Sequence, residues 1–327
     1  MPTAPWRGSK GPPGLLSIDM NTLSPTLMSA YTTFQLGGAC PCLVECQGPD
    51  ELTETVRKFR KEKARFLLIG GGSNIVVSDR GLAMNVVRYL SDSPLIVRQG
   101  CDITVQAGTV LDDAALFCVD EGLDGLNYAT GIPGTVGGAV VGNAGAWGRQ
   151  IGDVLKSAVV LNGQGDLKTV GPEYFAFSYR HSRLKESEDI VVSVTLGLSE
   201  GDPAQLGIQR SEILKTRSEK HPDLSTHPCA GSFFRNIDPT SKAERRQAAG
   251  WFLEQAGGKD LKAGGAYIFE KHANIIVKGP GATSQNVHDL HLKMIDVVKK
   301  KFNIQLVREV RFAGKFSNAP LDQEGFW

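Results

Sequence analysis

Residues 66–74 read FLLIGGGSN and residues 130–148 read TGIPGTVGGAVVGNAGAWG, and these two glycine-rich stretches indicate how the N-terminal half of the chain folds. In the first, an apolar run typical of a buried strand leads directly into a loop whose bare N–H groups can form a nest for an anion such as a pyrophosphate. The second stretch holds seven glycines and almost no charge. Its backbone can therefore lie against a large flat or phosphorylated ligand, because few side chains keep that ligand away.

Neither stretch matches a standard nucleotide-binding motif. The chain contains no G-x-x-x-x-G-K-[ST] and no G-x-G-x-x-G, which argues against a P-loop ATPase and against an ordinary Rossmann dinucleotide domain. One such loop alone is more often a tight turn. Two loops of this glycine density in one domain favour a dinucleotide that is held by the backbone.

The overall composition is that of a globular protein. Of the 327 residues, 41% are hydrophobic and 22% charged, and the chain is long enough for two cores. Lys and Arg number 36 against 35 Asp and Glu, so the net charge of +1 offers no field to attract nucleic acid. No apolar run approaches the roughly 20 residues of a membrane span, and the N-terminus lacks the apolar segment of a signal peptide. We therefore expect a cytoplasmic protein without a nucleic-acid or membrane partner.

Apolar periodicity predicts both strands and helices. A change from glycine-rich and strand-rich sequence to helical and charged sequence falls near residues 201–210, and we place a domain boundary at SEGDP, residues 199–203. The resulting division has a loose tail at 1–26, an N-terminal domain at 27–203, a C-terminal domain at 204–315 and a second tail at 316–327. We expect strands at 65–70, 101–108, 154–162 and 189–198. One helix should begin at a cap on Asp50, and a second should contain Leu111, Ala115 and Cys118. Three more helices are expected at 203–219, 243–256 and 283–301.

The cysteines indicate no metal site. Cys40, Cys42 and Cys46 lie within GACPCLVEC, residues 38–46, and no cysteine is spaced from a histidine as zinc ligands are. Three thiolates could hold a metal, but the segment reads as an apolar strand, in which buried free cysteine is the commoner state in a reducing cytosol. We predict a strand with buried thiols and no metal.

Three polar residues are candidates for catalysis or ligand binding because of their sequence neighbours. Ser232 lies between a glycine and two phenylalanines without the G-x-S-x-G of a nucleophile elbow, so it is either a serine that gives or relays a proton or a plain turn serine. Glu309 alternates away from the apolar face of a strand at 304–314, toward solvent or a cleft. Arg180 follows an aromatic segment, where an arginine can stack on a ring or bind a carboxylate.

Taken in order, the motifs of this chain resemble those of the bacterial UDP-N-acetylenolpyruvoylglucosamine reductases. The resemblance covers most of the chain, from residue 32 to residue 314. Besides GGGSN and GIPGTVGGAV, it rests on TTFQLGG at 32–38, YRHSRLK at 179–185, KTRSEKHP at 215–222, GSFFRN at 231–236, GGAYIFEKHANIIV at 264–277 and REVRFAG at 308–314.

The resemblance implies an α+β fold with two domains. A two-lobed FAD-binding domain of the vanillyl-alcohol-oxidase-like type would occupy residues 27–203, and a smaller α+β substrate-binding domain residues 204–315. FAD would be bound non-covalently, with NADPH as co-substrate. The residues expected to contact FAD are Gly70, Gly71, Gly72, Ser73, Asn74, Thr130, Gly131, Ile132, Pro133, Gly134, Gly137, Gly138, Asn143 and Gly145.

The resemblance also implies the reaction, which is reduction of UDP-N-acetylglucosamine enolpyruvate to UDP-N-acetylmuramate by a monomer. Arg180 falls on the arginine of Y-R-x-S, Ser232 on the proton-donating serine of G-S-F-F, and Glu309 on the glutamate of E-V-R-F. Lys220 and Asn236 match substrate-binding positions. Because a bare carboxylate would repel the enolate that forms, Glu309 should share or carry a proton, so we expect its pKa to be raised.

The chain departs from the family pattern at a few places. It has Leu184-Lys185 where the family usually writes F-K, Arg235-Asn236-Ile237 in place of K-N-P, and Gly142 in place of a glutamine. It has no tyrosine between Tyr179 and Tyr267, so it resembles the shorter class without a tyrosine cap over the substrate. The alternatives are another FAD-dependent oxidoreductase or oxidase on the same domain, and a flavin-binding protein without turnover.

Overall fold

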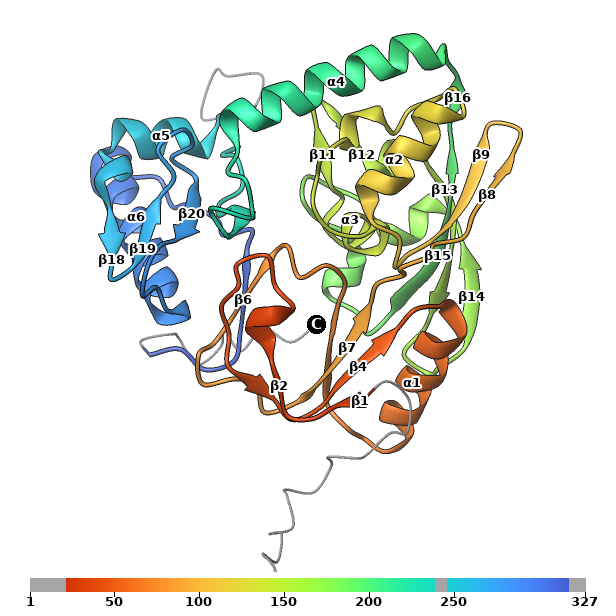
Figure 1. Ribbon diagram of the computed structural model, residues 1–327, viewed down its shortest axis with the longest axis horizontal. Helices are drawn as coiled ribbons and strands as arrows, with labels where there is room; N and C mark the ends of the chain where they lie inside the picture. The colour runs from red at the N-terminus through yellow and green to blue at the C-terminus, as the bar shows by residue number, and fades with distance from the viewer. Residues whose placement is uncertain (1–21, 239–245, 318–327) are drawn as a thin grey trace, which may run out of the picture.

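The computed structural model describes residues 22–238 and 246–317. Two larger sheets and their helices form most of the N-terminal part, and a third larger sheet with two helices forms the C-terminal part (Figure 1). The long helix α4 (Pro203–Lys220) runs across the top of the molecule from one part to the other (Figure 1).

The first sheet is built around a β-α-β unit. Its order is β1-β4-β7-β5, with β4 and β5 both parallel to β7 and β1 antiparallel to β4. Helix α1 (Pro49–Lys61) joins β4 to β5 and buries Leu52, Val56 and Phe59 as expected. Its cap is Gly48 and not Asp50, because Pro49 occupies the first helical position and Asp50 therefore lies inside the first turn. The strands are β1 (Thr22–Leu23), β4 (Leu43–Cys46), β5 (Phe66–Ile69) and β7 (Asn85–Tyr89).

The second sheet is antiparallel and carries the other strands that the sequence predicted. Its order is β14-β13-β15-β9-β8. Helices α2 (Leu111–Asp120) and α3 (Val136–Gly142) pack with it in the larger hydrophobic core. The strands are β8 (Ile96–Gln99), β9 (Asp102–Gln106), β13 (Leu155–Leu161), β14 (Leu167–Val170) and β15 (Ile190–Gly197).

Several short elements correct the sequence prediction. Residues 38–46 are not one strand, because Pro41 separates β3 (Ala39–Cys40) from β4. The predicted N-terminal tail is too long at its inner end, since β2 (Thr26–Leu27) pairs with β3 and β1 pairs with β4. The other short elements are η1 (Met28–Ala30), β6 (Ile75–Val77), β10 (Leu123–Asp124), η2 (Asn127–Ala129), β11 (Gly145–Ala146), β12 (Arg149–Gln150), η3 (Ile151–Asp153), η4 (Pro172–Phe175), η5 (Arg183–Lys185) and β16 (Ser199–Glu200).

The C-terminal part is a four-stranded antiparallel sheet with two helices. Its order is β17-β20-β19-β18. The helix expected at 243–256 is shorter and begins at Ala249, whereas residues 239–245 lie outside the described part of the chain. The elements are β17 (Cys229–Ser232), α5 (Ala249–Gln255), η6 (Gly258–Asp260), β18 (Lys262–Ala263), β19 (Ala266–Ile268), β20 (Ile275–Lys278) and α6 (Ser284–Phe302).

The end of the described chain returns to the N-terminal part. The strand predicted at 304–314 is regular only in β21 (Arg311–Ala313), which pairs in parallel with β6. The alternation within 304–314 still holds, since Leu306, Val310 and Phe312 are buried. Phe316, which the sequence assigned to a tail, stacks on the ring of His288 at 5.2 Å. The predicted C-terminal tail is therefore too long at its inner end as well.

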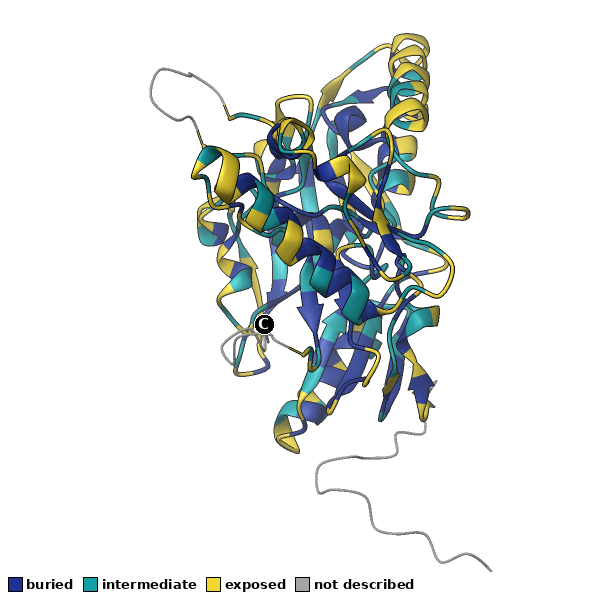
Figure 2. Cartoon of the chain, turned by 90° about the vertical axis from the view of Figure 1, so that its left-hand side faces the viewer, coloured by how far each residue is buried: buried dark blue, intermediate teal, exposed yellow. Residues whose placement is uncertain are grey.

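Two large hydrophobic cores correspond roughly to the two parts. The first contains buried residues between 42 and 196, and the second contains residues 229–312 together with Phe34, Leu36 and Val76 from the N-terminal part. Helix α4 buries little, and most of its surface is exposed (Figure 2). The boundary near residue 203 stays a prediction. No helix within residues 22–238 and 246–317 combines the length and the hydropathy needed to cross a bilayer.

Two histidines of α6 are buried in the second core. His288 and His291 are 1% and 3% exposed and contact Phe312. Burial lowers the pKa of His291 to about 3 and also lowers the pKa of His288. The unfolded chain takes up protons at these residues near pH 6.5, whereas the folded chain does not. Their effect on the free energy of unfolding is therefore absent above pH 6.5 and becomes destabilising as the pH falls toward 3.

We expect His291 alone to lower the free energy of unfolding by about 2 kcal/mol at pH 5 relative to pH 7.5. Urea unfolding at both pH values measures this difference, and the same measurement on His291→Leu should show a difference that is smaller by that amount. An equal pH dependence in both proteins would contradict the assignment.

Candidate active site

A cavity of about 1530 Å³ lies between the two parts of the molecule. Both glycine-rich stretches, the end of α4, β17 and the segment before β21 contribute to its lining. Pockets for one small molecule usually measure about 300–1,000 Å³. This cavity therefore has room for a large cofactor and a second ligand.

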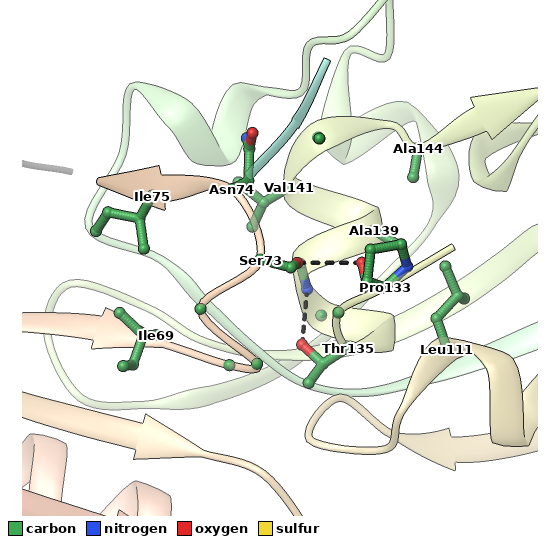
Figure 3. Close-up of a pocket in the computed structure, with 18 of the residues that line it drawn as sticks. Ile69, Ser73, Asn74, Ile75, Leu111, Pro133, Thr135, Ala139, Val141 and Ala144 are labelled. Atoms are coloured by element: carbon green, nitrogen blue, oxygen red, sulfur yellow. Dashed lines mark hydrogen bonds between the residues drawn. The ribbon is translucent and has the colours of Figure 1, made fainter. Parts of the chain in front are cut away.

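The two glycine-rich stretches meet at this cavity. The Ser73 hydroxyl donates a hydrogen bond to the Pro133 carbonyl at 3.1 Å (Figure 3). A Cβ atom at Gly70 would lie 2.4 Å from Thr135 Oγ1, and one at Gly71 would lie 3.4 Å from Gly134 Cα. Glycine is required at Gly70 because a side chain would push the two loops apart.

Helix α3 presents three glycines to the cavity, Gly137, Gly138 and Gly142, and the last two have open space beside them. Its N-cap Thr135 accepts a hydrogen bond from the Gly138 N–H at 3.2 Å (Figure 3). A Cβ at Gly138 would meet only Thr135 Oγ1, at 3.5 Å, and one at Gly142 would meet nothing within 4 Å. The space beside these glycines is therefore open to a ligand, and this glycine-lined cradle fits a flat or phosphorylated cofactor.

Most of the predicted cofactor residues line the cavity, with two exceptions. Thr130 is fully buried and bonds to Asn127 and Arg210. The Asn143 amide donates to Gln150 Oε1 and to the Ser178 carbonyl, both at 2.9 Å. The side chains of Thr130 and Asn143 therefore stabilise the loops by hydrogen bonds within the protein, and they do not line the cavity. The predicted residues that do are Gly70, Gly71, Gly72, Ser73, Asn74, Gly131, Ile132, Pro133, Gly134, Gly137, Gly138 and Gly145.

The three predicted catalytic residues also line this cavity. Arg180 Nε lies 3.1 Å from Glu309 Oε1 and forms an ion pair. Ser232 ends β17, and the next residue, Phe233, accepts a hydrogen bond from the Glu309 N–H at 2.8 Å. No described group makes a hydrogen bond with the Ser232 hydroxyl. The backbone pairing thus brings the serine and the glutamate to one place.

The cofactor loop contacts the same segment. The Asn74 amide donates to the Glu309 carbonyl at 3.3 Å, and the Asn74 carbonyl accepts from the Arg311 N–H at 3.0 Å. Parallel pairing of β6 with β21 continues this contact. The candidate catalytic residues are therefore held directly against the loop that is expected to bind the cofactor.

Arg180 is held in an unusual backbone conformation. Its φ is +55°, in the left-handed region that favours glycine. It lies in a tight turn closed by two hydrogen bonds of 3.1 Å between the backbones of Ser178 and His181. A non-glycine residue costs roughly 1–2 kcal/mol in this conformation. Such strain persists only where the surroundings fix it, as at functional sites.

Glu309 lies among cations and is half-buried. Burial raises the pKa of its carboxyl, while Arg180, Lys185 and Arg235 oppose the rise. The predicted direction of the shift is therefore confirmed, and its main cause is burial. The pKa of Lys185 falls to about 8, first because of burial and then because of Arg311.

The charge of the cavity differs from that of the chain. The whole chain is close to neutral at +1, yet eight Lys or Arg residues line the cavity against four Asp or Glu residues. Such a surplus of positive charge attracts anionic ligands. The cations are Arg60, Lys63, Arg65, Arg180, Lys185, Arg217, Lys220 and Arg311, and the anions are Glu188, Asp189, Asp223 and Glu309.

The two predicted substrate residues differ in position. Lys220, the last residue of α4, lines the cavity. Asn236 does not, because its side-chain oxygen accepts a hydrogen bond from the Ala249 N–H at 3.3 Å. In the described structure it holds the start of α5.

Lys185 and Trp147 are two of the lining residues to which the sequence gave no role. Lys185 belongs to the YRHSRLK motif, but the motif alone gives its ammonium no task. Trp147 occupies the tip of the β11–β12 hairpin, where it has a φ of +55° and is 59% exposed. A large aromatic residue beside Gly148 in a hairpin turn, where Asn-Gly is usual, is the signal that could have identified it.

The cysteines of residues 38–46 are buried and unpaired, as predicted. Burial raises the pKa of Cys40 and of Cys46 to about 11, so both stay protonated at neutral pH.

Two family models match this chain. The model described as UDP-N-acetylenolpyruvoylglucosamine reductase, C-terminal domain, matches residues 222–313, and that of an FAD binding domain matches residues 40–171. The UDP-N-acetylenolpyruvoylglucosamine reductase of Nostoc punctiforme is 36% identical over 312 residues, which cover 93% of this chain and 90% of that protein. The reductase of Carboxydothermus hydrogenoformans is 34% identical over 290 residues, covering 88% and 92%.

A solved structure agrees with these matches. The crystal structure of the reductase from Thermus caldophilus matches with a TM-score of 0.73 at 28% identity, covering 88% of this chain and 98% of that one. These findings confirm the α+β fold with an FAD-binding domain, and FAD as the cofactor. Identity above 30% over nine-tenths of the chain shows that the protein belongs to the UDP-N-acetylenolpyruvoylglucosamine reductase family.

Proposed function

We propose that this protein reduces UDP-N-acetylglucosamine enolpyruvate to UDP-N-acetylmuramate with NADPH, a step of peptidoglycan precursor synthesis. One observation carries this proposal: the Arg180–Glu309 ion pair and Ser232 line the same cavity as the glycine cradle. The glycines of the two loops would hold FAD, which would supply the hydride chemistry between NADPH and the substrate's methylene carbon. The side chains must then stabilise the negative charge that this transfer creates and donate a proton to the substrate.

Arg180 stabilises the negative charge. Hydride addition leaves charge on the α-carbon and the carboxylate of the enolpyruvyl group, and a planar guanidinium can bind that carboxylate through two N–H groups. The ion pair with Glu309 orients the guanidinium before substrate arrives. Preorganised donors of this kind contribute about 3–4 kcal/mol to the transition state.

Glu309 and Ser232 are the residues proposed to hold and donate the proton that the substrate's α-carbon takes up. A second carboxylate beside Arg180 disfavours the charged form of Glu309, whose pKa burial already raises. Glu309 can therefore share a proton when substrate is bound. Ser232 donates the proton to the α-carbon, directly or through a water, because a serine hydroxyl alone is a weak acid.

Lys220 and the positive cavity hold the diphosphate of the substrate. Lys220 is placed at the C-terminal end of α4, the helix that joins the two parts. Asn236 contributes indirectly by ordering the start of α5. We propose that the protein acts as a cytoplasmic monomer, as the resemblance to the reductase family implies.

The competing functions lack support from the C-terminal part. Another oxidase on the same FAD-binding domain would not need the reductase C-terminal domain matched at residues 222–313. A flavin-binding protein without turnover would not need Arg180, Ser232 and Glu309 together in one cavity.

The purified protein tests the proposal directly. We expect it to be yellow, to release FAD on denaturation, and to oxidise NADPH rapidly only when UDP-N-acetylglucosamine enolpyruvate is present. The control assay supplies UDP-N-acetylglucosamine, which lacks the enolpyruvyl group. Equal NADPH oxidation with both sugars, or a colourless protein that FAD cannot reconstitute, would overturn the proposal.

The cradle itself can be tested at Gly138. Gly138→Leu places a side chain in the open space beside α3, so we expect the variant to lose most of its FAD, with affinity falling by about 100-fold or more. Leucine is a better helix former than glycine, so the apoprotein should melt no lower than wild type. Flavin absorbance per protein after reconstitution and thermal unfolding of the apoprotein measure the two effects.

The matched control is Gly207→Leu. Gly207 is also helical, and a Cβ atom there would meet nothing within 4 Å, but this glycine does not line the cavity. It should retain full flavin. Gly72→Val is unsuitable, because a Cβ at Gly72 would lie 2.1 Å from the Tyr31 carbonyl and would disturb the fold itself. Full flavin occupancy in Gly138→Leu would contradict the assignment of the cradle.

A further inference from the structure

Lys185 lies next to the Arg180–Glu309 pair, and the proposed reaction gives it no task. Its Nζ donates a hydrogen bond to the backbone carbonyl of Arg180 at 2.7 Å. Lys185 also lines the cavity, although its ammonium is directed at a backbone atom of the protein. A lysine that served only to attract anions would not need this bond.

The helix that carries Lys185 is firmly attached to the FAD-binding domain. Lys185 ends η5, and Ser182, which precedes this helix, is fully buried. The Ser182 hydroxyl donates to the Val141 carbonyl at 2.8 Å, near the end of α3. Leu184 is only 2% exposed and packs in the first core. The lysine therefore reaches the Arg180 turn from a support that is fixed independently of that turn.

Side chains from outside the turn bond to three of its carbonyls: Asn143 to that of Ser178, Arg235 to that of Tyr179 and Lys185 to that of Arg180. Of these three, Lys185 is the one that holds the residue with the left-handed backbone. Only two backbone hydrogen bonds, between Ser178 and His181, close the turn, and Arg180 has its φ of +55° inside it. The Arg180 carbonyl points out of the turn to the lysine. If the backbone at Arg180 relaxed, the guanidinium would move away from Glu309, because the side chain starts from the same Cα.

Charged groups surround Lys185 on several elements. Arg180 faces it from the turn, Arg235 from the segment after β17, Glu309 from the segment before β21, and Arg311 from β21 itself. Three arginines oppose a further cation at this position, and one carboxylate favours it. A half-buried ammonium in such surroundings is stabilised by a specific bond, and the Arg180 carbonyl accepts one.

We propose that Lys185 is a positioning residue, whose ammonium holds the Arg180 carbonyl and so fixes the left-handed turn that presents the guanidinium to Glu309 and to the substrate carboxylate. The last part of this inference rests on the proposed function. The fixing of the turn does not, since it depends only on contacts within the protein.

The test compares wild-type holoenzyme with Lys185→Met and Arg183→Met. Methionine keeps the length of the lysine side chain and removes its charge. Arg183 is the matched control, since it lies on the same η5 helix, stacks over Tyr174 at 4.7 Å and does not line the cavity. Hydrogen–deuterium exchange of peptides covering residues 178–185 reports on the turn, and stopped-flow flavin absorbance reports on the two half-reactions.

In Lys185→Met we expect amide exchange in the turn to become about 10-fold faster. Oxidation of the reduced enzyme by the enolpyruvyl substrate should slow by about 100-fold, as for a displaced catalytic group. The change should appear mainly in kcat. Reduction by NADPH, FAD content and melting temperature should stay near wild-type values, and Arg183→Met should match wild type throughout.

The pH profile adds a readout that a merely structural residue would not change. The pKa of Lys185 is lowered to about 8, chiefly by burial. The wild-type kcat for the oxidative half-reaction should therefore fall above pH 8 as the ammonium loses its proton, and this fall should be missing in Lys185→Met.

The possible results distinguish a failure of the Lys185 inference from a failure of the proposed function. Unchanged exchange in the turn, or faster exchange with unchanged kinetics, overturns the positioning role. Equal loss of both half-reactions together with a lower melting temperature overturns it as well, because it shows a general structural role. If the wild-type enzyme does not turn over the enolpyruvyl substrate, the proposed function fails, and the exchange measurement alone still decides whether Lys185 fixes the turn.

Discussion

Ser232→Ala is expected to separate the two half-reactions. The variant should bind FAD and accept hydride from NADPH at nearly the wild-type rate, because Ser232 lies at the end of β17 and not in the cradle. Its oxidation by UDP-N-acetylglucosamine enolpyruvate should be slower by about 100-fold to 10,000-fold, the usual contribution of a positioned proton donor. Stopped-flow absorbance of the flavin follows both rates in one experiment.

Solvent deuterium provides a second measurement. In wild type, product formed in D₂O should carry deuterium at the lactyl α-carbon, because the proton comes from solvent through Ser232. Ser211→Ala is the control, since this hydroxyl bonds to the Gly207 carbonyl within α4 and the residue does not line the cavity. If Ser232→Ala kept a near-wild-type oxidative rate, the serine would be a turn residue and Glu309 would become the candidate donor.

Arg180→Asn should lose catalysis without losing stability. Asparagine tolerates the left-handed conformation better than arginine does, so the turn with φ of +55° should persist. Glu309 would still face Lys185 and Arg235, so its carboxylate would not be left without a cation. The melting temperature should therefore equal or exceed that of wild type.

The oxidative half-reaction of Arg180→Asn should slow by about 100-fold to 1,000-fold or more, because the developing carboxylate charge loses its preorganised donor. Arg180→Lys, which keeps the charge but not the planar fork, should recover only part of the rate. Stopped-flow kinetics measure the oxidative rate, and thermal unfolding of the same preparations measures the melting temperature. A large loss of stability, or a retained oxidative rate, would contradict the role of Arg180.

Much of the secondary structure follows from short-range patterns in the sequence. The apolar periodicity of residues 52–59 predicts α1, and the strand pattern at 189–198 predicts β15, because both elements bury one face or both faces against a core. The glycine density of residues 130–148 likewise indicates backbone that approaches a ligand. The order of motifs along the chain is enough to indicate the family.

The secondary-structure prediction is wrong where the apolar or capping pattern conflicts with another property of the sequence. Asp50 is a good helix cap, but Pro49 starts the helix one residue earlier than that pattern suggests. Pro41 lacks an N–H group for the sheet, so it interrupts the strand that the apolar residues 38–46 predict. Residues 304–310 alternate like a strand, but only an isolated bridge from Phe234 to Arg308 pairs with them.

The active site depends on contacts between segments far apart in sequence. Periodicity reports only which neighbours share a face, so it places Glu309 away from the core without showing that it meets Arg180. In loops no repeat relates a side chain to its surroundings, and Thr130, Asn143 and Asn236 therefore resemble ligand contacts in sequence although they bond within the protein. The sequence by itself determined most of the longer elements, the two glycine-rich loops and the family. Only the tertiary structure decided which polar groups converge on the cavity, because long-range packing sets the direction of each side chain there.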